Sequence, residues 1–170
     1  INVIVAHLGG GISVGAHKKG EVIDVNNALN GDGPFSPERS GGLQVGQLIK
    51  LCFSGDYSKD EVKKMNKGKG GMVAYLGSND AYEVEKRSEG GDKKAQFITD
   101  AMAYQVAKEI GSLAAVLEGE VDGILITGGI AYNKNFVKFV EKMTGFFAPV
   151  KSYAGEDEMA ALANNGLMVL

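Results

Sequence analysis

The first 25 residues carry short apolar segments that are separated by glycine-containing turns. Residues 3–8 and 12–16 flank three consecutive glycines at residues 9–11, and residues 21–25 follow the next turn. Alternation of apolar with polar or small residues around glycines is typical of β-hairpins. The pattern therefore predicts a three-stranded antiparallel meander.

Patterns of a longer period follow a polar, glycine-rich loop at residues 26–36. Apolar side chains that repeat every three or four positions predict a long helix over residues 92–117. The nearly all-apolar run at residues 122–127 is typical of a strand covered on both faces. The other predicted elements are helices at residues 43–53, 60–65, 133–144 and 156–170, and a strand at residues 149–153. Together these elements predict an α/β fold, a mixed five-stranded sheet with helices on both faces.

Composition narrows the choice of partners and of compartment. The 170 residues fit one domain, and 18 basic against 21 acidic residues give a net charge of −3 without a basic patch. We therefore expect no nucleic-acid partner. No apolar run approaches the roughly 18 residues of a membrane span, and Cys52 is the only cysteine, so we expect a cytoplasmic protein without disulfides. The chain opens inside a strand at Ile1 without an initiator methionine, and we expect a preceding half to lie outside it.

The three consecutive glycines are the first candidate for a ligand site. Without Cβ atoms, Gly9, Gly10 and Gly11 can adopt positive φ, come close to a ligand and direct successive N–H groups at one anion, for which phosphate is the obvious candidate. His7 precedes them at a strand end, where it is either structural or a hydrogen-bond donor to a phosphoryl oxygen. A flexible hairpin tip is the alternative.

Arg39 is the second candidate, because it lies in a glycine-flanked loop just before a predicted helix. A guanidinium in such a place suits bidentate contact with phosphate. The alternative is a surface salt bridge with Glu38 or Asp32.

The third candidate lies where the strand at residues 122–127 ends in Gly128 and Gly129, followed by Ile130. Ligands of open α/β sheets bind at the carboxyl ends of strands, and glycines there let a flat adenine or ribose lie on the backbone. Neither a Walker A loop nor a Gly-x-Gly-x-x-Gly motif is present. The acidic residues Glu156, Asp157 and Glu158 open the last predicted helix, where they either cap it or reach Mg²⁺ through water.

These motifs together resemble the acetate and butyrate kinase family, its butyrate kinase branch most closely, within the group that includes actin, Hsp70 and hexokinase. Residues 7–13 look like its second phosphate motif, and residues 33–42 look like the segment with its catalytic arginine. Gly10 stands where acetate kinases have asparagine, and residues 131–132 stand where they have Gly-Glu, which favours the butyrate-type assignment. The fold implied is the ribonuclease H-like, actin-like ATPase domain.

The resemblance also implies the roles of individual residues. Arg39 and His7 would be catalytic, and Asp157 and Glu158 would lie near Mg²⁺. The nucleotide, ATP or ADP, would be bound by glycine-rich and turn residues, namely Gly9, Gly10, Gly11, Ser78, Asp80, Gly128, Gly129, Ile130 and Asn133.

Residues 1–170 would then be the single C-terminal, nucleotide-binding domain of a two-domain kinase. The missing N-terminal half would hold the first phosphate motif, the carboxylate pocket and the catalytic aspartate. The implied reaction is transfer of the ATP γ-phosphoryl group to butyrate, giving butanoyl phosphate and ADP in fatty acid fermentation, by a homodimer or higher homo-oligomer. The fragment alone is predicted to be inactive.

The competing hypothesis is an actin-like or Hsp70-like ATP-binding module without carboxylate kinase chemistry. Arg39 distinguishes the two, because a module that only closes around a nucleotide needs no arginine directed at the transferred group.

Overall fold

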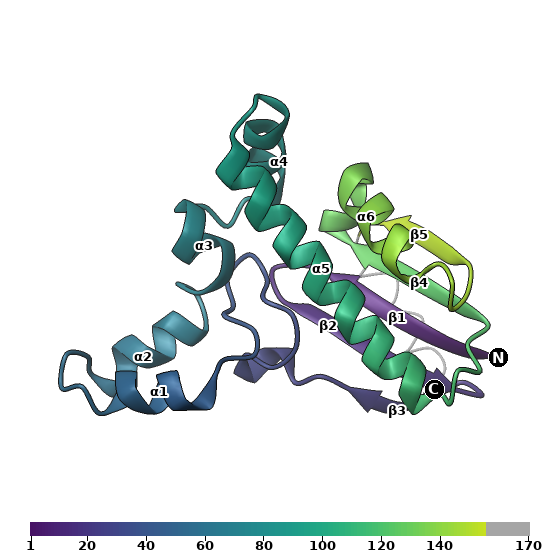
Figure 1. Cartoon of the computed structure of the whole chain (residues 1–170), viewed down its shortest axis with the longest axis horizontal. Helices are drawn as coiled ribbons and strands as arrows, with labels where there is room; N and C mark the ends of the chain where they lie inside the picture. Colours follow the sequence, from purple (N-terminus) through teal and green to yellow (C-terminus); the bar gives the residue numbers. More distant parts are fainter. Residues whose placement is uncertain (156–170) are drawn as a thin grey trace, which may run out of the picture.

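The computed structural model describes residues 1–155, which are built around a five-stranded sheet in the order β3-β2-β1-β4-β5 (Figure 1). β1, β2 and β3 form an antiparallel meander, and β4 and β5 extend the sheet in parallel with β1. The strands are β1 (Asn2–Leu8), β2 (Ile12–Lys18), β3 (Glu21–Val25), β4 (Gly123–Gly128) and β5 (Val150–Ala154). The predicted mixed five-stranded sheet is confirmed.

The observed helices agree with the predicted ones wherever an apolar repeat extends over several turns. The helices are α1 (Val45–Cys52), α2 (Lys59–Asn66), α3 (Gly71–Leu76), α4 (Ala81–Glu89), α5 (Lys93–Val116) and α6 (Lys134–Thr144), with 3₁₀ segments η1 (Ala28–Asn30) and η2 (Gly129–Tyr132). α1 begins at Val45 rather than at residue 43, and the helix predicted at residues 156–170 lies outside the described residues. No helix among residues 1–155 is long and apolar enough to cross a membrane.

α3 and α4 were not predicted, for a physical reason. α3 has only six residues, and Val84 is the one buried residue of α4, so neither helix carries a repeating apolar stripe. α4 depends instead on a cap, because the Asp80 side chain accepts hydrogen bonds from the amides of Tyr82 and Glu83. A capping aspartate is a helix-start signal that periodicity does not reveal.

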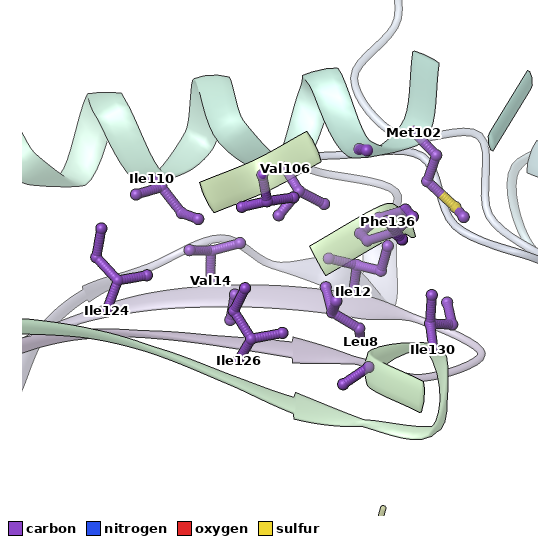
Figure 2. Close-up of a cluster of buried hydrophobic side chains, with 14 of the residues drawn as sticks. Leu8, Ile12, Val14, Met102, Val106, Ile110, Ile124, Ile126, Ile130 and Phe136 are labelled. Atoms are coloured by element: carbon purple, nitrogen blue, oxygen red, sulfur yellow. The ribbon is translucent and has the colours of Figure 1, made fainter. Parts of the chain in front are cut away.

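The core lies between the sheet and α5, as Figure 2 shows. Ile4, Ala6 and Leu8 alternate along β1 and are completely buried on the face that α5 covers. Full burial of a side chain the size of isoleucine or leucine stabilises the fold by about 1.5–3 kcal/mol relative to exposure. α6 packs against α5, so both helices cover this face of the sheet. The core side chains labelled on the sheet and helices are Leu8, Ile12, Val14, Met102, Val106, Ile110, Ile124, Ile126, Ile130 and Phe136.

α1 and α2 lie at a distance from the sheet, at the left of Figure 1. Neither helix contains a buried residue. Val45, Ile49 and Phe53, in and just after α1, are large apolar side chains that remain exposed. The helical cover of the domain core is therefore supplied by α3 to α6 and not by this pair.

Candidate functional site

The glycine turn connects β1 to β2 at the carboxyl end of β1. The last residue of β1, Leu8, is paired with Ile12 of β2, and the Gly9 amide donates to the Gly11 carbonyl oxygen at 3.1 Å. None of the three glycines has a positive φ, which corrects the expectation that they supply left-handed backbone. A Cβ on Gly11 would lie 2.0 Å from Nη1 of Arg39. The guanidinium thus lies directly against Gly11, and a side chain at this position would have to displace it.

Arg39 reaches the glycine turn from the loop between η1 and α1. Its Nη1 donates to the Ala28 carbonyl oxygen at 3.0 Å, and its backbone amide donates to Oγ of Ser36 at 3.2 Å. Within residues 1–155, no carboxylate forms an ion pair with this guanidinium. The alternative of a salt bridge with Glu38 or Asp32 is therefore wrong.

The two carboxylates next to Arg39 in the sequence have other partners. Glu38 accepts from Nδ2 of Asn79 in the turn before α4. Asp32 accepts from the backbone amides of Asn27 and Gly33, at 3.0 and 2.9 Å. Among residues 1–155, the arginine therefore has no carboxylate partner and lies as a positive charge beside the glycine turn.

An open pocket of about 820 Å³ brings together the residues predicted to bind phosphate. Its lining comes from the glycine turn, the start of the following strand, the loop after β3 and the Arg39 loop, and consists of His7, Gly9, Gly10, Gly11, Ser13, Val25, Asn26, Asn27, Ala28, Leu29, Glu38 and Arg39.

His7 lies at the junction of β1 and β4. Its Nδ1 is 3.0 Å from Oγ1 of Thr127, its registered partner on the parallel neighbour strand. This contact holds the imidazole at the carboxyl ends of both strands, and either tautomer of the ring can form it. His7 therefore combines a structural contact with a place in the lining of the glycine-turn pocket, so the two hypotheses for it are compatible.

A second pocket, of about 330 Å³, lies between η2, α4 and α5. Of the residues predicted to bind the nucleoside, Gly129, Ile130 and Asn133 line it. Gly128 does not, because it packs against β1: its φ is +92°, and a Cβ there would lie 2.5 Å from the Leu8 carbonyl oxygen. The other lining residues, which the sequence did not indicate, are Met72, Ala81, Tyr82, Glu85, Thr99, Met102 and Tyr132.

Ser78 and Asp80 precede that pocket and are not part of its lining. Oδ1 of Asp80 accepts from the amides of Tyr82 and Glu83 at 2.9 and 3.1 Å, and the Ser78 hydroxyl donates to the Glu83 carboxylate. The Asp80 side chain caps α4 and so positions Tyr82 at the pocket, and the Ser78 hydroxyl accepts from the Asp80 amide. That they touch adenosine stays a prediction.

Glu85 is the ionisable group of this second pocket. Burial raises the pKa of its carboxyl above the ordinary value, the neighbouring Glu89 carboxylate raises it further, and Lys86 opposes them. Within the described part of the chain, the Glu85 carboxyl has no hydrogen-bond or ion-pair partner. It is a polar group that a bound base or ribose could engage.

A metal site is not formed by residues 1–155. They contain no group of three or more His, Cys, Asp or Glu side chains that could hold an ion. Asp157 and Glu158, the predicted metal-binding residues, lie outside the described residues, so that prediction stays open.

Two buried polar residues that contact the glycine turn or its neighbouring strand were missed by sequence reasoning, Asn26 and Ser36. The Asn26 side chain accepts from the Val14 amide at 2.6 Å and donates to the Ile12 and Asp32 carbonyl oxygens at 3.2 and 3.0 Å. The Ser36 hydroxyl bonds both Gly10 and Arg39. Nothing in a polar loop distinguishes a buried asparagine or serine from an exposed one, because the partners are distant in sequence.

Comparisons with known proteins agree with the resemblance. The acetokinase family profile matches residues 1–148. Butyrate kinase 2 of Clostridium acetobutylicum is 59% identical over 170 residues, which are 100% of this chain and 48% of that protein.

Two solved structures share the fold. The acetate kinase of Porphyromonas gingivalis matches 99% of this chain with a TM-score of 0.87 and 21% identity, and the chain covers 49% of it. A propionate kinase of Francisella tularensis matches 92% of this chain with a TM-score of 0.76 and 26% identity, and the chain covers 47% of it. The actin-like ATPase fold is thus confirmed, and the chain spans about half the length of these relatives. By its sequence match over residues 1–148, the chain belongs to the acetokinase family.

Proposed function

We propose that this chain is the C-terminal, nucleotide-binding half of a short-chain carboxylate kinase. The whole protein would transfer the γ-phosphoryl group of ATP to butyrate, giving butanoyl phosphate and ADP. Butyrate is proposed as the acceptor because the 59% identical relative is called a butyrate kinase. Membership of the acetokinase family disfavours the competing hypothesis of a closure module without kinase chemistry.

The observation that carries the proposal is a set of unpaired donors at the glycine turn. The amides of Gly10 and Gly11 donate to no acceptor among residues 1–155, and the Arg39 guanidinium donates there only to the Ala28 carbonyl. Successive free amides beside an unpaired guanidinium are typical of a site for a multiply charged anion. The β- and γ-phosphates of ATP fit that description.

The nucleoside would occupy the second pocket. Its lining combines apolar side chains such as Met72, Ile130 and Met102 with the polar groups of Asn133 and Glu85, a pattern common in small-molecule sites. The pair His7 and Thr127, at the ends of β1 and β4, would lie between base and phosphates.

In the proposed reaction, a carboxylate oxygen of the acid forms a bond to the γ-phosphorus, and the bond from that phosphorus to the bridging oxygen of ADP breaks. The electron pair leaves with ADP. Phosphoryl transfer depends mainly on positioning and on stabilisation of charge. Arg39, His7 and the glycine amides would stabilise the equatorial oxygens of the transferred group.

The rest of the proposal concerns groups outside residues 1–155. Mg²⁺ would be held through the phosphates and through Asp157 or Glu158, where it neutralises charge on the nucleotide. The carboxylate pocket would lie in the other half of the protein. We also propose a cytoplasmic enzyme of fatty acid fermentation that assembles as a homodimer or larger homo-oligomer.

Calorimetry on the 170-residue chain tests the nucleotide site. We expect weak but measurable binding of Mg-ADP, and an affinity for ADP greater than that for adenosine because of the phosphate contacts. In the protein containing both halves, Arg39→Ala should lower kcat by roughly 10²–10³ and leave the KM for ATP much less changed, because the guanidinium contacts the transferred group mainly in the transition state. Lys142→Ala, which removes an exposed charge from α6, is the matched control. No heat at millimolar Mg-ADP would refute the proposal.

A further inference from the structure

Ser36 connects the two parts of the glycine-turn pocket through one hydroxyl group. Its side chain is completely buried. Its Oγ donates to the Gly10 carbonyl oxygen at 2.7 Å and accepts from the Arg39 amide at 3.2 Å. We propose that Ser36 is a positioning residue that holds the glycine amides and Arg39 in the arrangement that binds the terminal phosphates of a nucleotide.

The bond to Gly10 sets the orientation of the peptide group between Gly10 and Gly11. A trans peptide is planar, with its C=O and N–H directed to opposite sides. Because Ser36 holds the Gly10 oxygen on one side, the Gly11 amide is directed to the other side. Two adjacent glycines have access to many backbone conformations, so without the Ser36 bond this peptide group is free to rotate.

The hydrogen bond from the Arg39 amide to the Ser36 hydroxyl fixes the backbone of Arg39, and with it the position from which the guanidinium side chain extends. Backbone contacts reinforce it: the Ser36 amide donates to the Arg39 carbonyl oxygen at 3.1 Å, and the Met72 amide of α3 donates to the Ser36 carbonyl oxygen at 3.1 Å. A Cβ on Gly71 would lie 1.8 Å from that same Ser36 oxygen, so the segment is packed tightly against α3. Ser36 is therefore held firmly in place, and it positions both the glycine amides and the Arg39 side chain.

The inference rests on the proposed nucleotide site and makes a separate claim about it. Ser36 does not line either pocket, so it would act only through Gly10 and Arg39. Loss of its hydroxyl should weaken binding of the phosphates and leave binding of the nucleoside unchanged. A residue that merely stabilises the fold would lower stability without changing the ratio of the two affinities.

The experiment measures the affinity of the 170-residue chain for ADP and for adenosine by NMR titration, in the wild type and in Ser36→Ala. We expect the ratio of the ADP affinity to the adenosine affinity to fall about tenfold in Ser36→Ala, which corresponds to the loss of about one hydrogen bond. The adenosine affinity should stay within about twofold. Ser36→Cys, which keeps the size of the side chain and weakens its donor, should lower the ratio in the same direction and serves if Ser36→Ala does not fold.

Thr144→Val is the matched control. The Thr144 hydroxyl is also buried and donates to the Val140 carbonyl oxygen at 2.8 Å, in α6 and away from both pockets. Its loss should lower stability and leave the ratio unchanged. An unchanged ratio in both Ser36 variants, or an equal loss for both ligands, would overturn the inference while the nucleotide site stands. A wild-type chain that binds ADP no better than adenosine would overturn the proposed phosphate site, and the inference with it.

Discussion

Gly11 and Arg39 lie in close contact, side chain against backbone. The guanidinium occupies the space where any Cβ on residue 11 would lie. The charge is held beside the Gly10 and Gly11 amides, and no carboxylate of the described residues 1–155 pairs with it. Because Gly11 has no side chain, the Arg39 guanidinium can lie directly against the glycine turn.

Glu109 of α5 is a second residue whose surroundings predict a measurable effect. Burial raises the pKa of its carboxyl above the ordinary value, and the carboxylates of Asp32 and Asp24 raise it further. The folded state therefore holds the proton more tightly than the unfolded chain does. That contribution favours folding below the unfolded pKa, near 4.3, and is lost as pH rises through the folded pKa.

Glu109→Gln should consequently stabilise the domain at pH 7, where the wild-type carboxylate is charged. The gain should be no more than about 1 kcal/mol, because the half-exposed group is screened by water, and it should shrink as pH falls towards 4. Urea unfolding at pH 7 and at pH 4 measures it. Glu120→Gln, at an exposed loop position, is the control with no expected gain. A stability of Glu109→Gln equal to or below wild type at pH 7 would contradict this account.

The junction between β1 and β4 is the element contact on which both pockets depend. β1 ends in the glycine turn, and β4 ends in Gly128, whose backbone lies directly against Leu8. Parallel pairing of the two strands places both carboxyl ends at the same edge of the sheet. The phosphate-binding turn and the nucleoside pocket are adjacent for this reason.

Gly128→Ala should damage that junction, and Gly129→Ala should not. Gly128 has a φ of +92°, and its Cβ would meet Leu8 backbone atoms, whereas a Cβ on Gly129 has nothing within 4 Å. Strain of this kind costs on the order of 1–3 kcal/mol, so we expect a loss of at least about 2 kcal/mol for Gly128→Ala and less than about 0.5 kcal/mol for Gly129→Ala. Chemical unfolding without ligand measures both. Equal stabilities of the two variants would show that the close contact is absent in solution.

For the molecule as a whole, the central expectation is that this chain alone has no kinase turnover. The acceptor must be held about 3–3.5 Å from the γ-phosphorus and in line with the bond that breaks. The proposed acceptor pocket belongs to the other half of the protein, and the glycine-turn pocket of this half is open. With butyrate and Mg-ATP, hydroxylamine trapping of acyl phosphate should give no product above background.

Two controls make that result informative. The protein containing both halves should give product in the same assay, and Arg39→Ala in the 170-residue chain shows what a contaminating kinase contributes. Product from the 170-residue chain that disappears in Arg39→Ala would mean that the acceptor site lies within this half.

Most of the fold was accessible from the sequence because its strands and long helices are encoded locally. Alternation around the glycines, the apolar repeat of α5 and the short run of β4 each identify an element without reference to distant residues. The motifs around His7, Arg39 and Gly129 were found in the same way. α3 and α4 escaped because they bury too few side chains to show a period.

The contacts between residues that are distant in sequence became visible in the folded molecule alone. Ser36 bonds Gly10 across 26 positions, His7 meets Thr127 across 120, and the Arg39 guanidinium lies against Gly11. Such contacts depend on how the strands pair and where the loops return, and a polar residue in a loop carries no local signal of either. The local patterns of the sequence predict most of the elements that form and indicate which groups are chemically suited to a nucleotide. The packing of the sheet against α3 and α5 decided which of those groups meet, because burial and close approach arise only once distant segments are in contact.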